Sequence, residues 1–202
     1  MFEDIINAFK KKNIDVIAVK TSEEACTKIL EMIPLKSKVG YSGSMTLEKI
    51  GILNKLRNHD CVFYDRDKVT KYTKDSYQLG HLAQHADYFL SSSNAITKDG
   101  KIVNRDKTGN RVSSMIYGPE HVIIVVGKNK IVKDYDAAIE RIRNVAAPMN
   151  AKRLKLNTPC VKTGKCMDCL LPESICCSTV IIDKQVNKER LKIILVDEEL
   201  GY

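Results

Sequence analysis

Residues 121–126 (HVIIVV) constrain the fold more than any other segment of this chain. Five aliphatic side chains follow one another there, without the polar alternation of a strand that has one face in water. Such a run is typical of a parallel strand that helices cover on both faces. It is also far shorter than the roughly 20 apolar residues that a membrane-spanning helix needs. The segment therefore predicts an inner strand of a parallel sheet.

Strand-like and helix-like segments alternate along the rest of the chain. A capping box (TSEE) at residues 21–24 begins one helix, Pro34 ends it, and Gly51 predicts a break within the next. An Asp-Gly pair within residues 98–101 predicts a hairpin turn. The predicted helices are 1–12, 21–33, 47–56, 77–85 and 135–142, and the predicted strands are 16–19, 38–41, 61–64, 88–90, 121–126, 180–182 and 191–196. This alternation predicts an α/β fold with a largely parallel sheet, which the last two strands join.

The composition fits one domain over residues 1–202. The chain is 44% hydrophobic, which is enough for a sizeable core and excludes disorder as its main state. No signal-peptide pattern is present, so we expect a cytoplasmic protein with reduced cysteines. The net charge of +8 favours anionic partners. Because the basic residues are scattered, Trp is absent and aromatic residues make up 6%, we expect neither a nucleic-acid nor a membrane partner.

Several loops beside the predicted strands carry groups that suit an anion. Ser44 and Thr46 follow one strand beside Gly43, where hydroxyls and free helix amides are anion donors, although Ser44 could equally be a plain helix cap. Asn94 lies in a mostly small and polar stretch, residues 91–97, which suits the lining of a polar pocket or a surface turn. Three more candidates follow, namely Asn110, Arg111 as a carboxylate or phosphate clamp or a surface charge, and Lys130 at the end of the most apolar strand.

The segment 157–177 is a cysteine-rich loop. Its spacing, Cys-x5-Cys-x2-Cys-x6-Cys, predicts that four thiolates bind one metal centre, with Cys177 as a substitute for the last of them. The four predicted ligands are Cys160, Cys166, Cys169 and Cys176. Zinc and a 4Fe–4S cluster both fit four thiolates, reactive thiols are a third interpretation, and unligated cysteines are a fourth. His81 and His85 lie one helical turn apart but lack a third ligand.

These motifs together resemble the LUD-domain family, the lactate-utilisation proteins. The matching segments include residues 43–46 (GSMT), 93–97 (SNAIT), 109–111 (GNR), 125–130 (VVGKNK) and 147–151 (APMNA). The resemblance implies a Rossmann-like sheet with helices on both faces, similar to sugar-phosphate isomerases and CoA transferases. It also implies a role in a multi-subunit system that oxidises lactate to pyruvate. The cysteine segment resembles a subset of the family found mainly in anaerobes, which favours 4Fe–4S over zinc.

Two functions follow as expectations. The first is an enzyme or enzyme subunit that acts on a small hydroxy or keto acid such as lactate or pyruvate. Lys130 would polarise the carbonyl or hydroxyl oxygen. The carboxylate would be held by Ser44, Thr46, Asn94, Asn110 and Arg111. The alternative is a metal-bearing accessory or sensor protein whose cysteine loop docks a redox partner, such as an iron–sulfur subunit of lactate oxidation. An oligomer is compatible with either function.

Overall fold

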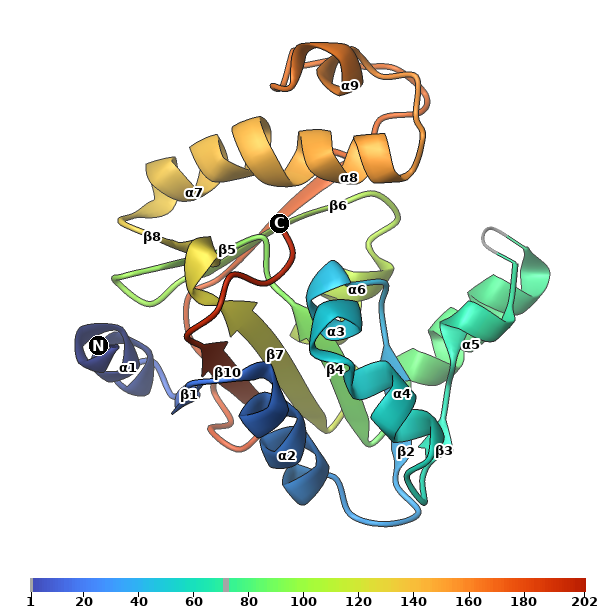
Figure 1. Cartoon of the computed structure of the whole chain (residues 1–202), viewed down its shortest axis with the longest axis vertical. Coiled ribbons are helices and arrows are strands. Elements are labelled where there is room, and N and C mark those ends of the chain that lie inside the picture. Colours follow the sequence, from blue (N-terminus) through green and yellow to red (C-terminus); the bar gives the residue numbers. More distant parts are fainter. Residues whose placement is uncertain (1, 71–72) are drawn as a thin grey trace.

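The computed structural model describes residues 2–70 and 73–202, so the first residue of the predicted helix 1–12 lies outside the described part. Its centre is a six-stranded parallel sheet in the order β1-β10-β7-β4-β2-β3 (Figure 1). The strands are β1 (Asp15–Val19), β2 (Lys38–Tyr41), β3 (Val62–Phe63), β4 (Tyr88–Ser92), β7 (His121–Gly127) and β10 (Leu191–Val196). The apolar run predicted to be an inner strand is β7, which pairs with β10 on one side and β4 on the other. The prediction of a parallel α/β sheet is confirmed.

Helices cover both faces of this sheet. The described helices are α1 (Glu3–Lys10), α2 (Ser22–Met32), α3 (Met45–Ile50), α4 (Ile52–Arg57), α5 (Lys74–Gln84), α6 (Asn110–Ile116), α7 (Tyr135–Arg141), α8 (Ala147–Arg153) and α9 (Pro159–Thr163). Thr21 caps α2 by accepting a hydrogen bond from the Glu24 amide, as the capping box predicts. Gly51, with φ of 81°, ends α3 and begins α4, so the predicted break in that helix is confirmed.

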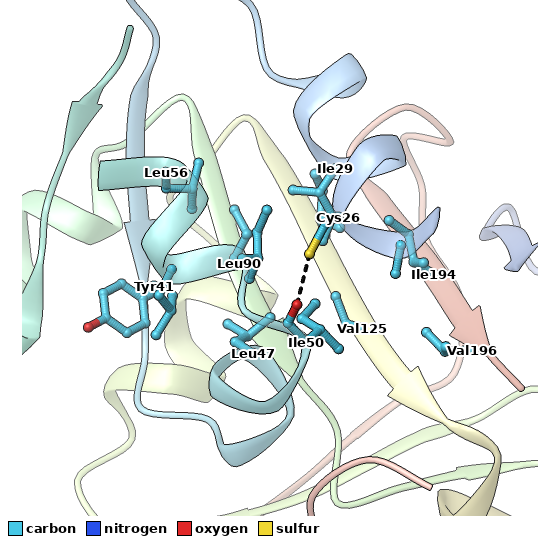
Figure 2. Close-up of a cluster of buried hydrophobic side chains, with 14 of the residues drawn as sticks. Cys26, Ile29, Tyr41, Leu47, Ile50, Leu56, Leu90, Val125, Ile194 and Val196 are labelled. Atoms are coloured by element: carbon cyan, nitrogen blue, oxygen red, sulfur yellow. Dashed lines mark hydrogen bonds between the residues drawn. The ribbon is translucent and has the colours of Figure 1, made fainter. Parts of the chain in front are cut away.

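The period-two alternation of the strands divides the apolar core into two layers. One layer joins α2, α3 and α4 to sheet residues such as Val125 and Ile194, and Figure 2 shows part of it. The other layer joins α1, α5 and α6 to residues such as Ile124. In the first layer, Cys26 is fully buried and its thiol donates to the Ile50 carbonyl at 3.1 Å, so this cysteine packs in the core (Figure 2).

A second sheet lies beyond the first and corrects the sequence prediction. It contains β5 (Ala95–Thr97), β6 (Ile102–Asp106), β8 (Ile131–Val132) and β9 (Ser178–Ile182) in the order β8-β5-β6-β9. The strand predicted at 180–182 belongs to β9 and pairs antiparallel with β6, so it does not join the parallel sheet. Within the stretch 91–97, which was interpreted as a polar loop, residues 95–97 are fully buried strand. The predicted turn at 98–101 connects β5 to β6, with Gly100 at φ 85°.

The long helical segment over the second sheet completes the frame around the site. Between α7 and α8, residues Ile142–Ala146 form a π-helical turn, η3, and Figure 1 shows α7 and α8 end to end above β5 and β6. Ala95, Ala138 and Ile142 form the small apolar core between these layers. The chain end, Tyr202, lies between this helical layer and α3 (Figure 1). Among residues 2–70 and 73–202, no helix is long and apolar enough to cross a membrane.

Candidate functional site

A cavity of about 620 Å³ opens where the carboxyl ends of the parallel strands meet the second sheet and α8. This edge is where open α/β sheets bind their ligands. The segments after β2, β4 and β7, the end of β6 with the start of α6, and the helix α8 all contribute side chains. Its lining residues include Ser42, Ser44, Ser92, Ser93, Asn94, Arg105, Asp106, Asn110, Arg111, Lys130, Ala147, Asn150, Arg153, Cys176 and Tyr202.

Lys130 is the cation buried at the base of this cavity. The residue is only 3% exposed, and its ammonium donates to the Thr46 hydroxyl at 2.8 Å, the Ser92 hydroxyl at 3.1 Å and the Ser93 carbonyl at 3.1 Å. All three acceptors are neutral. Burial, with a smaller contribution from the positive charges of Arg141 and Arg111, lowers the pKa of Lys130 to about 7. Lys130 therefore changes its charge near neutral pH.

Arg141 on α7 adds a second, partly buried positive charge that no described carboxylate pairs with. Its guanidinium donates to the backbone carbonyls of Asn129 at 3.0 Å and Asn94 at 2.6 Å. Burial lowers the pKa of Arg141. In the described part of the chain, neither Lys130 nor Arg141 makes a salt bridge. Since an unpaired buried charge is costly, this pair of cations favours the entry of an anion.

Arg111 is held entirely by the protein. Its five N–H groups point to five acceptors: the Asp106 carboxylate at 3.1 Å, the Ser92 carbonyl at 2.9 Å, and the acceptors on Asn104, Asn94 and Arg105. Every donor is occupied, so Arg111 ties β4 of the first sheet to β6 of the second and to the turn at Asn94, and it contributes its charge to the cavity. The bidentate carboxylate contact expected from the sequence would require some of these bonds to break.

The other predicted binding residues have the following positions. Ser44 caps α3 by accepting from the Leu47 amide at 3.3 Å, so the cap interpretation is confirmed; Ser44 also lines the cavity, and its contact with an anion stays a prediction. Asn94 and Asn110 also line the cavity. Thr46 does not line the cavity. Its hydroxyl accepts from the Lys130 ammonium and donates to the Leu200 carbonyl at 3.2 Å.

The chain end forms a wall of the cavity that the sequence did not indicate. Gly201 has φ of 60°, and a Cβ there would lie 2.7 Å from the Thr46 hydroxyl and 3.5 Å from the Lys130 ammonium. Asn129 holds this segment by accepting from the Leu200 amide at 3.0 Å and donating to the Gly201 carbonyl at 3.2 Å. The glycine therefore allows the backbone to pack directly against the lysine site.

Arg153 and Tyr202 form a polar group on the α8 side of the cavity. The Arg153 guanidinium donates to the Tyr202 hydroxyl at 2.7 Å and to Asn150 Oδ1, and the Tyr202 hydroxyl donates to the same Asn150 oxygen at 3.0 Å. Sequence reasoning missed these residues, Ser92 and Arg141 as parts of a site. Only the polar run 91–93 was a local signal for Ser92, because Arg153 and Tyr202 meet the cavity, and Arg141 approaches Lys130, through tertiary contacts alone.

The cysteine loop borders the same cavity through Cys176. Burial raises the pKa of the Cys176 thiol, Arg105 opposes this, and the nearby Cys166 and Cys160 thiols add to it. Cys166 accepts a hydrogen bond from the Asp168 amide at 3.4 Å. However, no three His, Cys, Asp or Glu side chains of the described residues are arranged to hold a metal ion. In this conformation the loop does not bring the four predicted thiolates together, and metal binding by the loop stays a prediction.

The loop is tied to the domain by other interactions. Arg143 of η3 makes a bidentate ion pair with Asp168, both contacts at 2.6 Å, and its carbonyl accepts from the Cys166 amide at 2.9 Å. Ile175 is buried, whereas Leu170 is 98% exposed. Ile175, the Arg143–Asp168 ion pair and the backbone bonds of Cys166 and Cys177 thus link the loop to the domain.

Comparison with solved structures supports the fold. The chain is similar to a DUF162 family protein from Deinococcus radiodurans, with 13% identity, a TM-score of 0.54, and coverage of 97% of this chain and 98% of that one. Ribose 5 phosphate isomerase A from Neisseria gonorrhoeae gives 11% identity and a TM-score of 0.33 over 55% of this chain and 53% of that one, too distant a likeness to carry an argument. No curated protein matches the chain. The family model of the LUD domain matches residues 2–196, nearly the whole chain, and the chain therefore belongs to the LUD-domain family.

Proposed function

We propose that this protein binds a small carboxylate, a hydroxy or keto acid of the lactate and pyruvate class, in the cavity around Lys130. The observation that carries the proposal is the buried ammonium of Lys130 beside Arg141, two charges whose described partners are all neutral. A carboxylate entering the cavity would supply the missing negative charge, and in that dry surrounding the attraction is stronger than in water. Membership of the LUD-domain family supports a lactate-utilisation role.

The side chains around the cavity would have different roles in such a site. Lys130, as an ammonium, would hold the carboxylate or polarise the oxygen on the neighbouring carbon, where charge develops during reaction. Ser44, Asn94 and Asn110 would orient the ligand from the cavity wall. Arg111 would keep these loops in register and supply long-range attraction. We infer that the chain works as an enzyme or enzyme subunit, with other subunits of lactate oxidation as its partners.

Calorimetric titration with lactate and with pyruvate tests the proposal. We expect saturable binding to the wild-type protein and a loss of about 10- to 100-fold in affinity for Lys130→Met, because a charge-assisted hydrogen bond contributes about 1.5–3 kcal/mol. Lys128→Met is the matched control, since Lys128 is two residues away, half-exposed and paired with Asp197 at 3.1 Å. Affinity should also fall as pH rises above about 7, where Lys130 loses its proton. Equal affinities in both variants would overturn the proposed site.

The metal-bearing accessory protein remains the second candidate, and one observation favours it. The Asp168 amide donates a hydrogen bond to the Cys166 sulfur in the Cys-x-x-Cys turn, so a backbone donor already faces the sulfur of one predicted ligand. Because the loop as folded does not gather its thiols, binding of a 4Fe–4S cluster or zinc would require it to rearrange. Anaerobic reconstitution, followed by metal and sulfide analysis, tests this candidate. One cluster or one zinc per chain, lost in Cys166→Ser, supports it, and metal-free protein excludes it.

A further inference from the structure

We propose that Lys130 is a nucleophile that forms a reversible covalent imine with the carbonyl carbon of a keto acid. This inference rests on the proposed function, since it assigns the substrate class and the reactive atom within the same cavity. It goes beyond charge recognition because it requires the lysine nitrogen to carry a free electron pair. The supporting observations are the position of this nitrogen in the cavity wall, the chemistry of its three partners and the charges that surround it.

The hydrogen-bond partners of Lys130 suit both protonation states of its nitrogen. A hydroxyl both accepts and donates, so Ser92, whose Oγ is 3.1 Å from the lysine Nζ, can accept from the ammonium or turn to donate to the neutral amine. The Thr46 hydroxyl already has an acceptor for its proton in the Leu200 carbonyl. A lysine that only stabilises the fold would be expected to face a carboxylate. Here its described partners are two hydroxyls and one backbone carbonyl.

The surrounding charges favour the neutral amine and attract the substrate at the same time. Burial, Arg141 and Arg111 bring the pKa of Lys130 to about 7, so a large fraction of the side chain is unprotonated at neutral pH. The same arginine charges remain after that proton leaves, and they draw the carboxylate of a keto acid toward the amine. Lowered lysine pKa in a dry pocket beside another cation is the established way to activate an amine for imine formation.

The chemistry balances without an oxidant or a metal. The Lys130 nitrogen lone pair attacks the keto carbon, the carbonyl π bond breaks, and one proton moves from the nitrogen to the oxygen to give a carbinolamine. The nitrogen lone pair then forms a carbon–nitrogen double bond as the carbon–oxygen bond breaks, and the hydroxyl leaves as water with the second proton from the nitrogen. Overall, one amine and one ketone give one imine and one water. The Ser92 hydroxyl, within hydrogen-bond distance of the nitrogen, is placed to pass protons during both steps.

Reductive trapping tests the proposal on the full-length protein. Wild-type protein is incubated with pyruvate and sodium cyanoborohydride, and the modified peptide is identified by mass spectrometry. We expect one reduced pyruvate per chain on the peptide that contains Lys130, with Lys128, its exposed neighbour, unmodified at the same dose. Lactate, which has no carbonyl group, is the matched ligand control and should give no adduct. In Lys130→Arg, which keeps a positive charge but has no nucleophilic amine, the adduct should disappear.

Each outcome separates this inference from the proposed function. If pyruvate binds in calorimetry but no adduct forms at Lys130, the imine is wrong and the carboxylate site stands. An adduct found only on exposed lysines also overturns the imine. If pyruvate neither binds nor is trapped, both proposals fail. Because the site of modification is read from the wild-type protein, the test does not depend on whether a Lys130 variant folds.

Discussion

Replacing Lys130 by methionine should change how the stability of the protein depends on pH. In the folded chain Lys130 has a pKa of about 7, lowered from the 10.5 of an exposed lysine by burial and by the charges of Arg141 and Arg111. Between these two values the unfolded chain holds a proton that the folded chain has released. The free energy of unfolding therefore rises with pH in this window for the wild-type protein. Methionine keeps a similar apolar length but cannot titrate, so the variant lacks this contribution.

The size of the effect follows from the two pKa values. Integrating the proton difference between pH 7 and pH 9 gives a gain of about 2 kcal/mol for the wild-type protein relative to the variant. Below pH 7 the difference between the two proteins should become constant, because both the folded and the unfolded chain then carry the charge. Losing the charge should also make Lys130→Met more stable than the wild-type protein near pH 6, since the buried ammonium has no described anionic partner.

Urea unfolding at several pH values measures this directly. The quantity to compare is the wild-type minus Lys130→Met difference in unfolding free energy, because other groups that titrate in the same range cancel in it. Lys128→Met serves as the control and should follow the wild-type pH dependence, since Lys128 is half-exposed. Parallel curves for wild type and Lys130→Met across this range would refute the reasoning, because they would mean that the folded protein holds Lys130 as an ordinary exposed amine.

Three other substitutions test the packing around the site. Gly40→Ala would put a Cβ 2.7 Å from the Ala83 Cβ and should lower the free energy of unfolding by about 1–3 kcal/mol in urea titration; an unchanged value would mean that α5 can move away from β2 freely. Leu47→Ala removes a fully buried side chain and should cost about 2–5 kcal/mol in the same assay, and a loss below 1 kcal/mol would argue that the site collapses around it. Gly201→Ala would force a Cβ to 2.7 Å from the Thr46 hydroxyl at a φ of 60°, so pyruvate affinity should fall by about tenfold in calorimetry, and unchanged affinity would separate the chain end from the site.

Local patterns in the sequence were sufficient to predict most strands of the parallel sheet. The run 121–126 predicts an inner strand because five consecutive aliphatic residues are stable only with cover on both faces, and β7 is the strand between β10 and β4. The capping box at Thr21 and the helix break at Gly51 were also predictable, since both depend on contacts within a few residues. Helices and strands of this kind can be predicted from a few consecutive residues.

The second sheet could not be predicted from short segments of the sequence. β9 resembles any half-buried strand in sequence, yet it pairs with β6, some 75 residues earlier in the chain. The buried residues of β5 follow directly after the polar run 91–93, which made the whole stretch resemble a loop. Which sheet a strand joins depends on loop closure and on the faces that remain uncovered, and short-range periodicity contains no information on either.

In the candidate site, too, the sequence predicts some features and tertiary contacts decide the others. The sequence marks Lys130 as a polar residue after an apolar strand, and Arg111 as a cation beside a glycine, but it contains no sign of their protonation or their partners. Tertiary contacts decide both. Thr46 is 84 residues away from Lys130 in the chain, and the five acceptors that occupy Arg111 come from β4, from β6 and from the turn between β4 and β5. The charge of a buried group depends on its distance from water and from other charges, and only the folded chain sets those distances.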